Sequence, residues 1–123
     1  MSDKRTVFKC PRCQTVISRP LLFLGCDESV CLEDQKSAIP VGFFGINRPE
    51  YWNVTGRFLV NLADLVGTRH HSERRRLSGC CGLDGTGGPN LVCPNGHEVG
   101  TEKSDCWMSH AAILLDDVEV LNE

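Results

Sequence analysis

The chain has 123 residues, of which 41% are apolar and 24% charged, and its net charge is −3. These values are ordinary for one globular domain spanning residues 1–123, and the negative charge disfavours a protein that binds nucleic acid through bulk phosphate attraction. The polar N-terminus lacks the apolar core of a signal peptide, and the longest apolar run is far too short to cross a bilayer. We therefore expect a cytoplasmic protein that does not bind membranes.

The first part of the chain predicts extended structure around a tight turn. β-Branched and bulky apolar residues in 6–24 flank the sequence CPRC, and Pro20 indicates an edge strand or two short pieces. The polar segment 26–40 has room for one helical turn. Residues 41–53 predict an irregular segment with short strands, and their aromatic side chains suit core packing or a partner surface.

The second part of the chain adds further short strands. Phe58–Val60 predicts a strand, after which Asn61 is placed to cap a helical turn over residues 63–66. Residues 111–115 predict a buried strand, followed by a helical turn after Asp116. The sequence therefore predicts a small, β-rich, mainly antiparallel domain with about seven strands and little helix.

Eight cysteines give the sequence its chemical character. Disulfides rarely persist in a reducing cytoplasm, so clustered cysteines indicate metal binding or catalysis. In CPRC, the thiolates of Cys10 and Cys13 can both bind one tetrahedral Zn²⁺ from a knuckle turn. Extended residues follow the motif instead of an amphipathic helix, which favours metal over a redox pair. Residues 1–35 are thus predicted to be an N-terminal zinc knuckle region.

Two alternative sets of residues could complete the metal site of Cys10 and Cys13. In the first, Cys10 and Cys13 share an ion locally with Cys26 and Cys31. In the second, they share it with ligands from residues 80–106, because zinc ribbons are built from two distant knuckles. The sequence leaves both arrangements open.

A second predicted zinc region covers residues 79–110, where glycine, proline and asparagine surround four cysteines. In CPNGH, Pro94 and Gly96 suit a knuckle turn, and the imidazole of a histidine can complete a zinc site. Two neighbouring aspartates, Asp84 and Asp105, are candidates to orient the ligands by accepting hydrogen bonds.

The leading arrangement for this region has three cysteines and one histidine. It combines one of Cys80 and Cys81 with Cys93, His97 and Cys106, and keeps His110 in reserve. Adjacent cysteines can point to opposite sides of an extended backbone, so only one of the pair is expected to face the ion. All eight cysteines and His97 are candidates for two zinc ions. A single zinc, with the other thiols buried as small apolar side chains, is the alternative.

Residues 69–76 form a basic cluster that contains two histidines, a serine and a glutamate. It can contact phosphate or an acidic partner, or it can be a solvated connector. The candidate contact residues are Arg69, Arg74, Arg75 and Arg76.

The motifs FKCPRC and CPNGH look like those of a zinc-ribbon protein. The longer pattern, GCCGLDGTGGPNLVC followed by EVGTEKSDCW, resembles a family of small, uncharacterised bacterial proteins. The resemblance covers much of residues 55–107 and the N-terminal knuckle. It implies a bacterial cytoplasmic protein with a zinc fold, and it implies no catalytic residue.

Together these patterns predict one or two structural zinc ions, because sites closed by four protein ligands are structural and not catalytic. We expect a binding or adaptor module that recognises a protein partner, and no enzyme. A nucleic-acid-binding zinc ribbon that uses residues 69–76 is the first alternative. A redox or metal-handling protein is the second.

Overall fold

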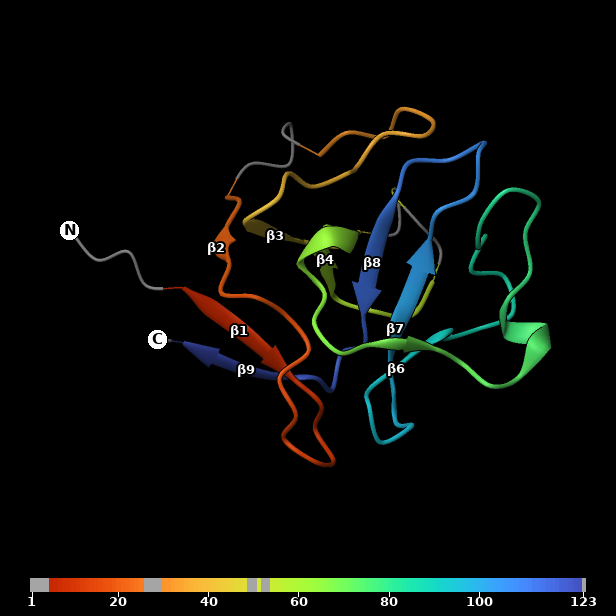
Figure 1. Cartoon of the computed structure of the whole chain (residues 1–123). Helices are drawn as coiled ribbons and strands as arrows, with labels where there is room; N and C mark the ends of the chain where they lie inside the picture. The colour runs from red at the N-terminus through yellow and green to blue at the C-terminus, as the bar shows by residue number, and fades with distance from the viewer. Residues whose placement is uncertain (1–4, 26–29, 49–50, 52–53, 123) are drawn as a thin grey trace.

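The computed structural model describes residues 5–25, 30–48, 51 and 54–122 (Figure 1). Strands are the main regular structure of these residues, and the helical structure within them consists of single turns of 3-10 helix at η2 (Leu62–Asp64) and η3 (Arg74–Arg76). The strands are β1 (Thr6–Lys9), β2 (Leu22–Phe23), β3 (Phe43–Ile46), β4 (Phe58–Val60), β5 (Arg69–His70), β6 (Leu91–Val92), β7 (Glu98–Lys103), β8 (Ala111–Leu114) and β9 (Glu119–Asn122).

The strands form two sheets. The larger has the order β2-β3-β4-β8-β7-β6-β5, and every pair in it is antiparallel except β2 with β3. The smaller is an antiparallel ribbon of β1 and β9, in which Thr6 lies opposite Asn122. In Figure 1 this ribbon lies on the left, beside the larger sheet. The prediction of a small β-rich, mainly antiparallel domain is confirmed.

The centre of the larger sheet is buried on both faces. Successive side chains of a strand point to opposite faces, and in β4 Phe58 and Val60 join one apolar cluster whereas Leu59 joins another. β8 divides in the same way, with Leu114 in the first cluster and Ile113 in the second. The short apolar strands of this sequence are therefore the centre of a sheet with two cores.

The β1–β9 ribbon covers the first of these cores. Phe8 of β1 is fully buried, with its ring centroid 4.8 Å from that of Phe58 and 5.2 Å from that of Phe44. The cysteines Cys10 and Cys93 belong to the same cluster. One thiol of each predicted knuckle therefore lies within the main hydrophobic core.

Several sequence predictions can be compared with these elements. Asn61 caps η2, where its Oδ1 accepts a hydrogen bond from the backbone N–H of Ala63 at 2.9 Å. The predicted helical turn after Asp116 is wrong, because β9 follows and pairs with β1. The number of strands was underestimated, since even the charged connector contributes β5, which pairs with β6.

The remaining predictions concern the segments before β4. Residues 30–40 form turns where a helical turn was considered, and residues 26–29 lie outside the described part. β2 is an edge strand, as Pro20 indicated. In the aromatic segment, Phe44 is buried in the core and Tyr51 packs against the second apolar cluster. None of the helices in the described ranges has the length and apolar character needed to cross a bilayer.

Replacing Phe8 tests the docking of the ribbon. We expect Phe8→Ala to lower the free energy of unfolding by about 3–5 kcal/mol, because it empties a buried aromatic site between the two sheets. Phe23→Ala is the matched control, since Phe23 also contacts Phe44 but is 58% exposed. Urea denaturation measures both variants, and equal losses would contradict the buried position of Phe8.

Candidate metal centres

The first cluster begins with a turn at the end of β1. The N–H of Cys10 donates to the carbonyl of Thr15 at 2.9 Å, and the N–H of Gln14 donates to the carbonyl of Cys10 at 3.0 Å. Gln14 adopts a left-handed conformation, with φ of 64°, which lets the chain reverse within CPRCQT. The turn places the Cys10 and Cys13 side chains on the same side.

A matching turn joins β6 to β7. The N–H of Cys93 donates to the carbonyl of His97 at 2.8 Å, and the N–H of Gly96 donates back to the carbonyl of Cys93 at 2.9 Å. Gly96 has φ of 85°, a conformation that glycine adopts without strain. The N–H of Asn95 points at the sulfur of Cys93, at 3.3 Å. CPNGH is therefore a second knuckle, as its turn residues indicated.

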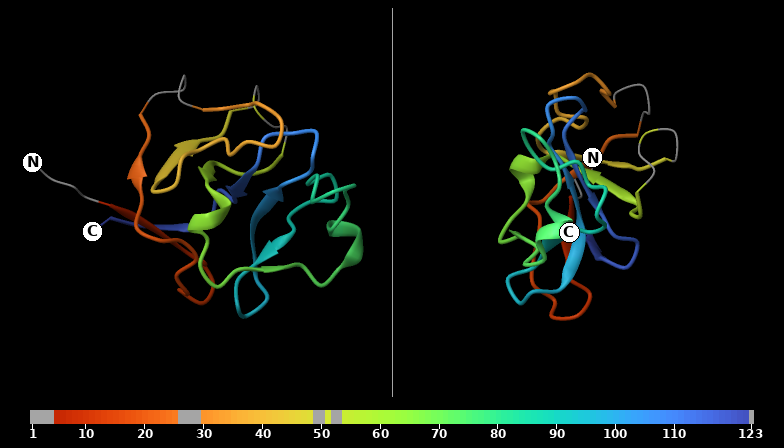
Figure 2. Two further views of the ribbon diagram at one scale, coloured as in Figure 1. Left: turned by 45° about the horizontal axis from the view of Figure 1, so that its top comes forward. Right: turned by 90° about the vertical axis from the view of Figure 1, so that its right-hand side faces the viewer.

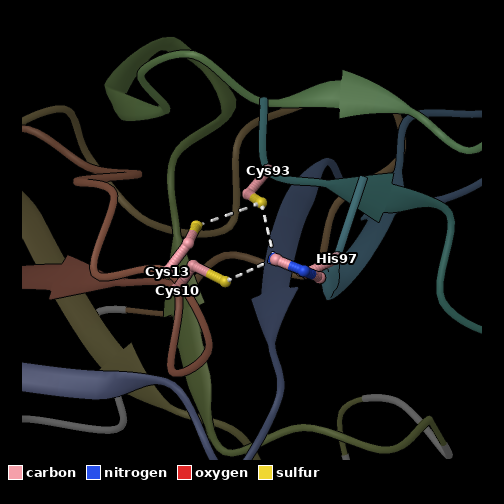
Figure 3. Close-up of side chains that lie close together, drawn as sticks. All are labelled: Cys10, Cys13, Cys93 and His97. Atoms are coloured by element: carbon pink, nitrogen blue, oxygen red, sulfur yellow. Dashed lines mark hydrogen bonds between the residues drawn. The ribbon is translucent and has the colours of Figure 1, made fainter. Parts of the chain in front are cut away.

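Figure 3 shows that the four side chains of the two knuckles converge. His97 Nδ1 lies 3.5 Å from Cys10 Sγ and 3.4 Å from Cys93 Sγ, and the sulfurs of Cys13 and Cys93 are 3.7 Å apart. A tetrahedral zinc with Zn–S bonds near 2.3 Å and a Zn–N bond near 2.0 Å separates its ligand atoms by about 3.5–3.8 Å. These spacings match the edges of such a tetrahedron, so this cluster could hold one metal ion.

The two thiols of the first knuckle differ in environment. Burial raises the pKa of Cys10, because a thiolate loses hydration there. The hydroxyl of Thr15, 3.0 Å from Cys13 Sγ, is the main cause that lowers the pKa of Cys13 to about 5. Cys13 is therefore the thiol of this knuckle that most readily supplies a thiolate ligand.

This grouping differs from the leading sequence-based arrangement. Cys93 and His97 lie with Cys10 and Cys13, and not with Cys106 and one of the adjacent cysteines. The long-range alternative for the CPRC pair describes this geometry. Cys31 is outside both clusters found among the described residues, with its sulfur 3.9 Å from a carboxylate oxygen of Glu33. Cys26 lies outside the described part of the chain.

A second cluster contains Cys80, Cys81 and Cys106, whose sulfurs all lie within 4.8 Å of one another. Cys80 and Cys81 are exposed, and Cys106 is half-buried. Both adjacent cysteines face the group, contrary to the expectation that only one would. Hydrogen bonding to the sulfurs of Cys106 and Cys80 favours the protonated thiol of Cys81 and raises its pKa to about 12. This cluster too could hold a metal ion.

One carboxylate fixes the backbone of this second cluster. Asp105 Oδ2 accepts hydrogen bonds from the N–H of Cys80 and from Trp107 Nε1, both at 3.0 Å. Its Oδ1 accepts from the N–H groups of Cys81 at 3.0 Å and Cys106 at 2.8 Å. These donors hold the pKa of the Asp105 carboxyl well below its usual range. An orienting role was considered for Asp105 from the sequence, and this geometry supports it.

Glycines allow the loop to close on this carboxylate. Gly79 has φ of 149°, and a Cβ there would lie 1.7 Å from the carbonyl oxygen of Gly82. A Cβ on Gly82 would lie 2.1 Å from the carbonyl oxygen of Ser104. Both positions therefore require glycine, and the turn-forming residues that surround these cysteines bring segments 79–82 and 104–107 together.

His110, the reserve ligand, belongs to neither cluster. Its Nε2 lies 2.9 Å from the carbonyl oxygen of Asp105. A carbonyl can only accept, so Nε2 carries the proton and donates it to that oxygen. His110 thus anchors the loop of the second cluster. Asp84, the other candidate to orient ligands, instead accepts hydrogen bonds at Oδ1 from the N–H and hydroxyl of Thr86.

The basic segment carries its own acidic partners. Arg75 contacts Glu73 at 2.7 Å, and Arg76 contacts Glu98 at 2.9 Å. His71 also contacts Glu98, at 2.9 Å. Arg69 lies on β5 and Arg74 begins η3. Much of the positive charge predicted to contact phosphate is therefore paired within the domain.

Comparison with protein-family models, with curated proteins and with solved structures finds no match to this chain. The chemistry of the two clusters is therefore the basis for assigning a function.

The Asp105 carboxylate offers a test of the second loop. Folding lowers the pKa of this carboxyl. The ionised carboxylate therefore contributes its full stabilisation when the pH is above the pKa of an unfolded aspartate, near 3.9. This stabilisation is lost only as the pH falls through the lower pKa of the folded state. We expect Asp105→Asn to lower the urea midpoint, because an amide nitrogen cannot accept from Cys80 and Trp107. The loss should be the same at pH 7 and pH 5.

The control is Asp117→Asn, which removes the same charge from an exposed turn. Both variants are measured at one fixed zinc concentration. An Asp105 variant no less stable than the Asp117 variant would contradict the role of this carboxylate.

Proposed function

We propose that the chain is a domain stabilised by structural zinc that acts as a binding or adaptor module for a protein partner. The observation that carries the zinc assignment is the cluster of Cys10, Cys13, Cys93 and His97 at tetrahedral spacings. Two hairpin knuckles that supply two ligands each are the arrangement of a zinc ribbon. Metal binding would hold β1 against the β6–β7 hairpin.

Zinc is the preferred ion because the donor set is three thiolates and one imidazole. Structural zinc sites use this set, whereas iron in a tetrahedral site is more often bound by sulfur alone. The four protein donors would fill the coordination shell and leave no position for a reactive water. This supports a structural ion, and we therefore propose that this site performs no catalysis.

The redox alternative has less support. A redox pair functions through its two cysteines alone, whereas here Cys93 and His97 complete a four-ligand set with Cys10 and Cys13. The cluster is also built on hairpin turns, not at the N-terminus of a helix, where redox CxxC motifs usually lie.

An exposed apolar patch at the edge of the larger sheet is the proposed partner surface. Phe23 on the edge strand β2 and Val41 just before β3 are each 58% exposed. The N–H of Leu22 donates to the carbonyl of Gly42 at 2.9 Å, which brings the two segments together. Sheet edges with exposed apolar side chains are common sites of pairing with another chain.

The nucleic-acid alternative depends on residues 69–76. Glu73 and Glu98 neutralise Arg75 and Arg76 within the domain, and the chain as a whole is negative. Strong attraction to phosphate needs unpaired basic residues. The charge distribution therefore favours the protein-binding proposal.

Metal removal tests the zinc assignment. Protein purified without added metal should contain zinc by elemental analysis, and a strong chelator should lower its stability. At free zinc a thousand times the dissociation constant, the ion contributes about 4 kcal/mol. His97→Ala should cause a comparable loss, and Cys31→Ser, which alters a thiol outside both clusters, should not. Chelated protein that unfolds at the same urea concentration as untreated protein would refute the assignment.

A photo-crosslinking amino acid at position 23 tests the partner surface. We expect it to capture a protein in cell extract, and the purified partner should bind the chain at least tenfold more weakly after Phe23→Ala with Val41→Ser, because the apolar contact area is lost. The same amino acid at Val120, which is also exposed, is the control. Binding to RNA that falls steeply with salt and needs Arg74–Arg76 would favour the nucleic-acid alternative instead.

A further inference from the structure

The cluster of Cys80, Cys81 and Cys106 lies outside the proposed zinc-ribbon site. The proposed zinc ribbon uses only the first cluster, and yet three further thiols, from two segments of chain, are gathered within 4.8 Å of one another. Thiols that pack as small apolar side chains are usually buried, whereas Cys80 and Cys81 are exposed. Apolar packing therefore does not explain why these three thiols converge, whereas binding of a ligand does.

We propose that Cys80, Cys81 and Cys106 form a second metal site, an open three-thiolate site for a thiophilic cation such as Zn²⁺. Its fourth coordination position would be filled from outside the cluster. The proposal goes beyond the structural role of the first cluster, because a site with only three protein ligands can exchange its ion or accept an external ligand.

The donor atoms select the class of ion. Three sulfurs favour soft or borderline cations over Mg²⁺ or Ca²⁺, which bind oxygen. Bonds of about 2.3 Å to zinc would place the sulfurs about 3.8 Å apart, so small rotations of side chains within the present 4.8 Å suffice. Binding displaces three thiol protons to the buffer and leaves a complex of one divalent ion and three thiolates, with net charge −1.

The backbone around the cluster is held in place without an ion. The carboxylate of Asp105, 1% exposed, accepts the N–H groups of all three cluster cysteines. One buried anion thus fixes three ligands from two segments of chain, with 24 residues separating Cys81 from Asp105. This hydrogen bonding orients the ligand-bearing backbone in the way that groups around a metal site orient its ligands.

Exposure distinguishes the two clusters. Cys10 and Cys93 are fully buried in the main core, so an ion there would be shielded from solvent. Cys80 and Cys81 are exposed at the surface. Trp107, 58% exposed, is held beside the second cluster by its hydrogen bond to Asp105.

Cobalt titration of the full chain tests the proposal. Co²⁺ can replace zinc in such sites, and its bonds to thiolates give an absorption band in the near-ultraviolet that reports binding. We expect the wild type to bind two equivalents, and the triple variant Cys80→Ser, Cys81→Ser, Cys106→Ser to bind one. Ser78→Ala, a change at a half-buried residue near Cys80 that belongs to neither cluster, should keep both. A chromogenic chelator should remove zinc from the second site at least tenfold faster than from the first.

Alkylation of the wild type provides a measurement that needs no variant. Added zinc should slow the reaction of Cys80 and Cys81 with iodoacetamide at least tenfold, and the chelator should restore it. A wild type that binds only one equivalent of cobalt, and a triple variant that keeps it, with no protection of these cysteines by zinc, would overturn this site and leave the first intact. A wild type that binds only one equivalent, which is lost in the triple variant but kept in His97→Ala, would instead support this site and refute the first.

Discussion

A cluster of four side chains that could bind one metal ion brings together two parts of the chain that are remote in sequence. Cys10 follows β1 and His97 precedes β7, 87 residues later, yet their side chains lie 3.5 Å apart. The arrangement depends on two knuckle turns that present their ligands from the ends of separate hairpins. The position of the β1–β9 ribbon relative to the larger sheet is fixed at this point and by the packing of Phe8.

The Cys10, Cys13, Cys93 and His97 cluster and the hydrophobic core are parts of one packing arrangement. Cys10 and Cys93 lie in the same apolar cluster as Phe58 and Leu114, so the side of each thiol that does not face the other ligands contacts apolar side chains. Burial makes free thiolates unfavourable, and a bound cation would offset that cost. Removal of an ion bound there would therefore disturb the core beside it as well as the two turns.

Local features of this fold could be predicted from the sequence. The CPRC and CPNGH turns, the cap at Asn61 and the strand at Phe58–Val60 depend on neighbouring residues, and the structure has all of them. The division of thiols between two clusters depends on which strands pair and on how the ribbon packs. No local pattern encodes those contacts.

Two wrong predictions, at residues 119–122 and at Cys80 and Cys81, also depended on contacts between distant parts of the chain. Residues 119–122 mix charged, apolar and polar side chains, so their sequence alone does not indicate a strand. They form one because β1, more than a hundred residues away, supplies the edge with which they pair. For Cys80 and Cys81, alternation along an extended backbone was assumed. The backbone there bends around the carboxylate of Asp105, so both sulfurs reach one point.

The pairing of Thr6 with Asn122 has a consequence for how this unit can be combined with other sequences. The Thr6 hydroxyl donates a hydrogen bond to Asn122 Oδ1 at 2.9 Å, and the two strands run in opposite directions. Any polypeptide joined before β1 and any joined after β9 would thus start from adjacent points on one side of the molecule (Figure 2). The domain could be inserted into a surface loop of a host protein with little separation of the two ends of that loop.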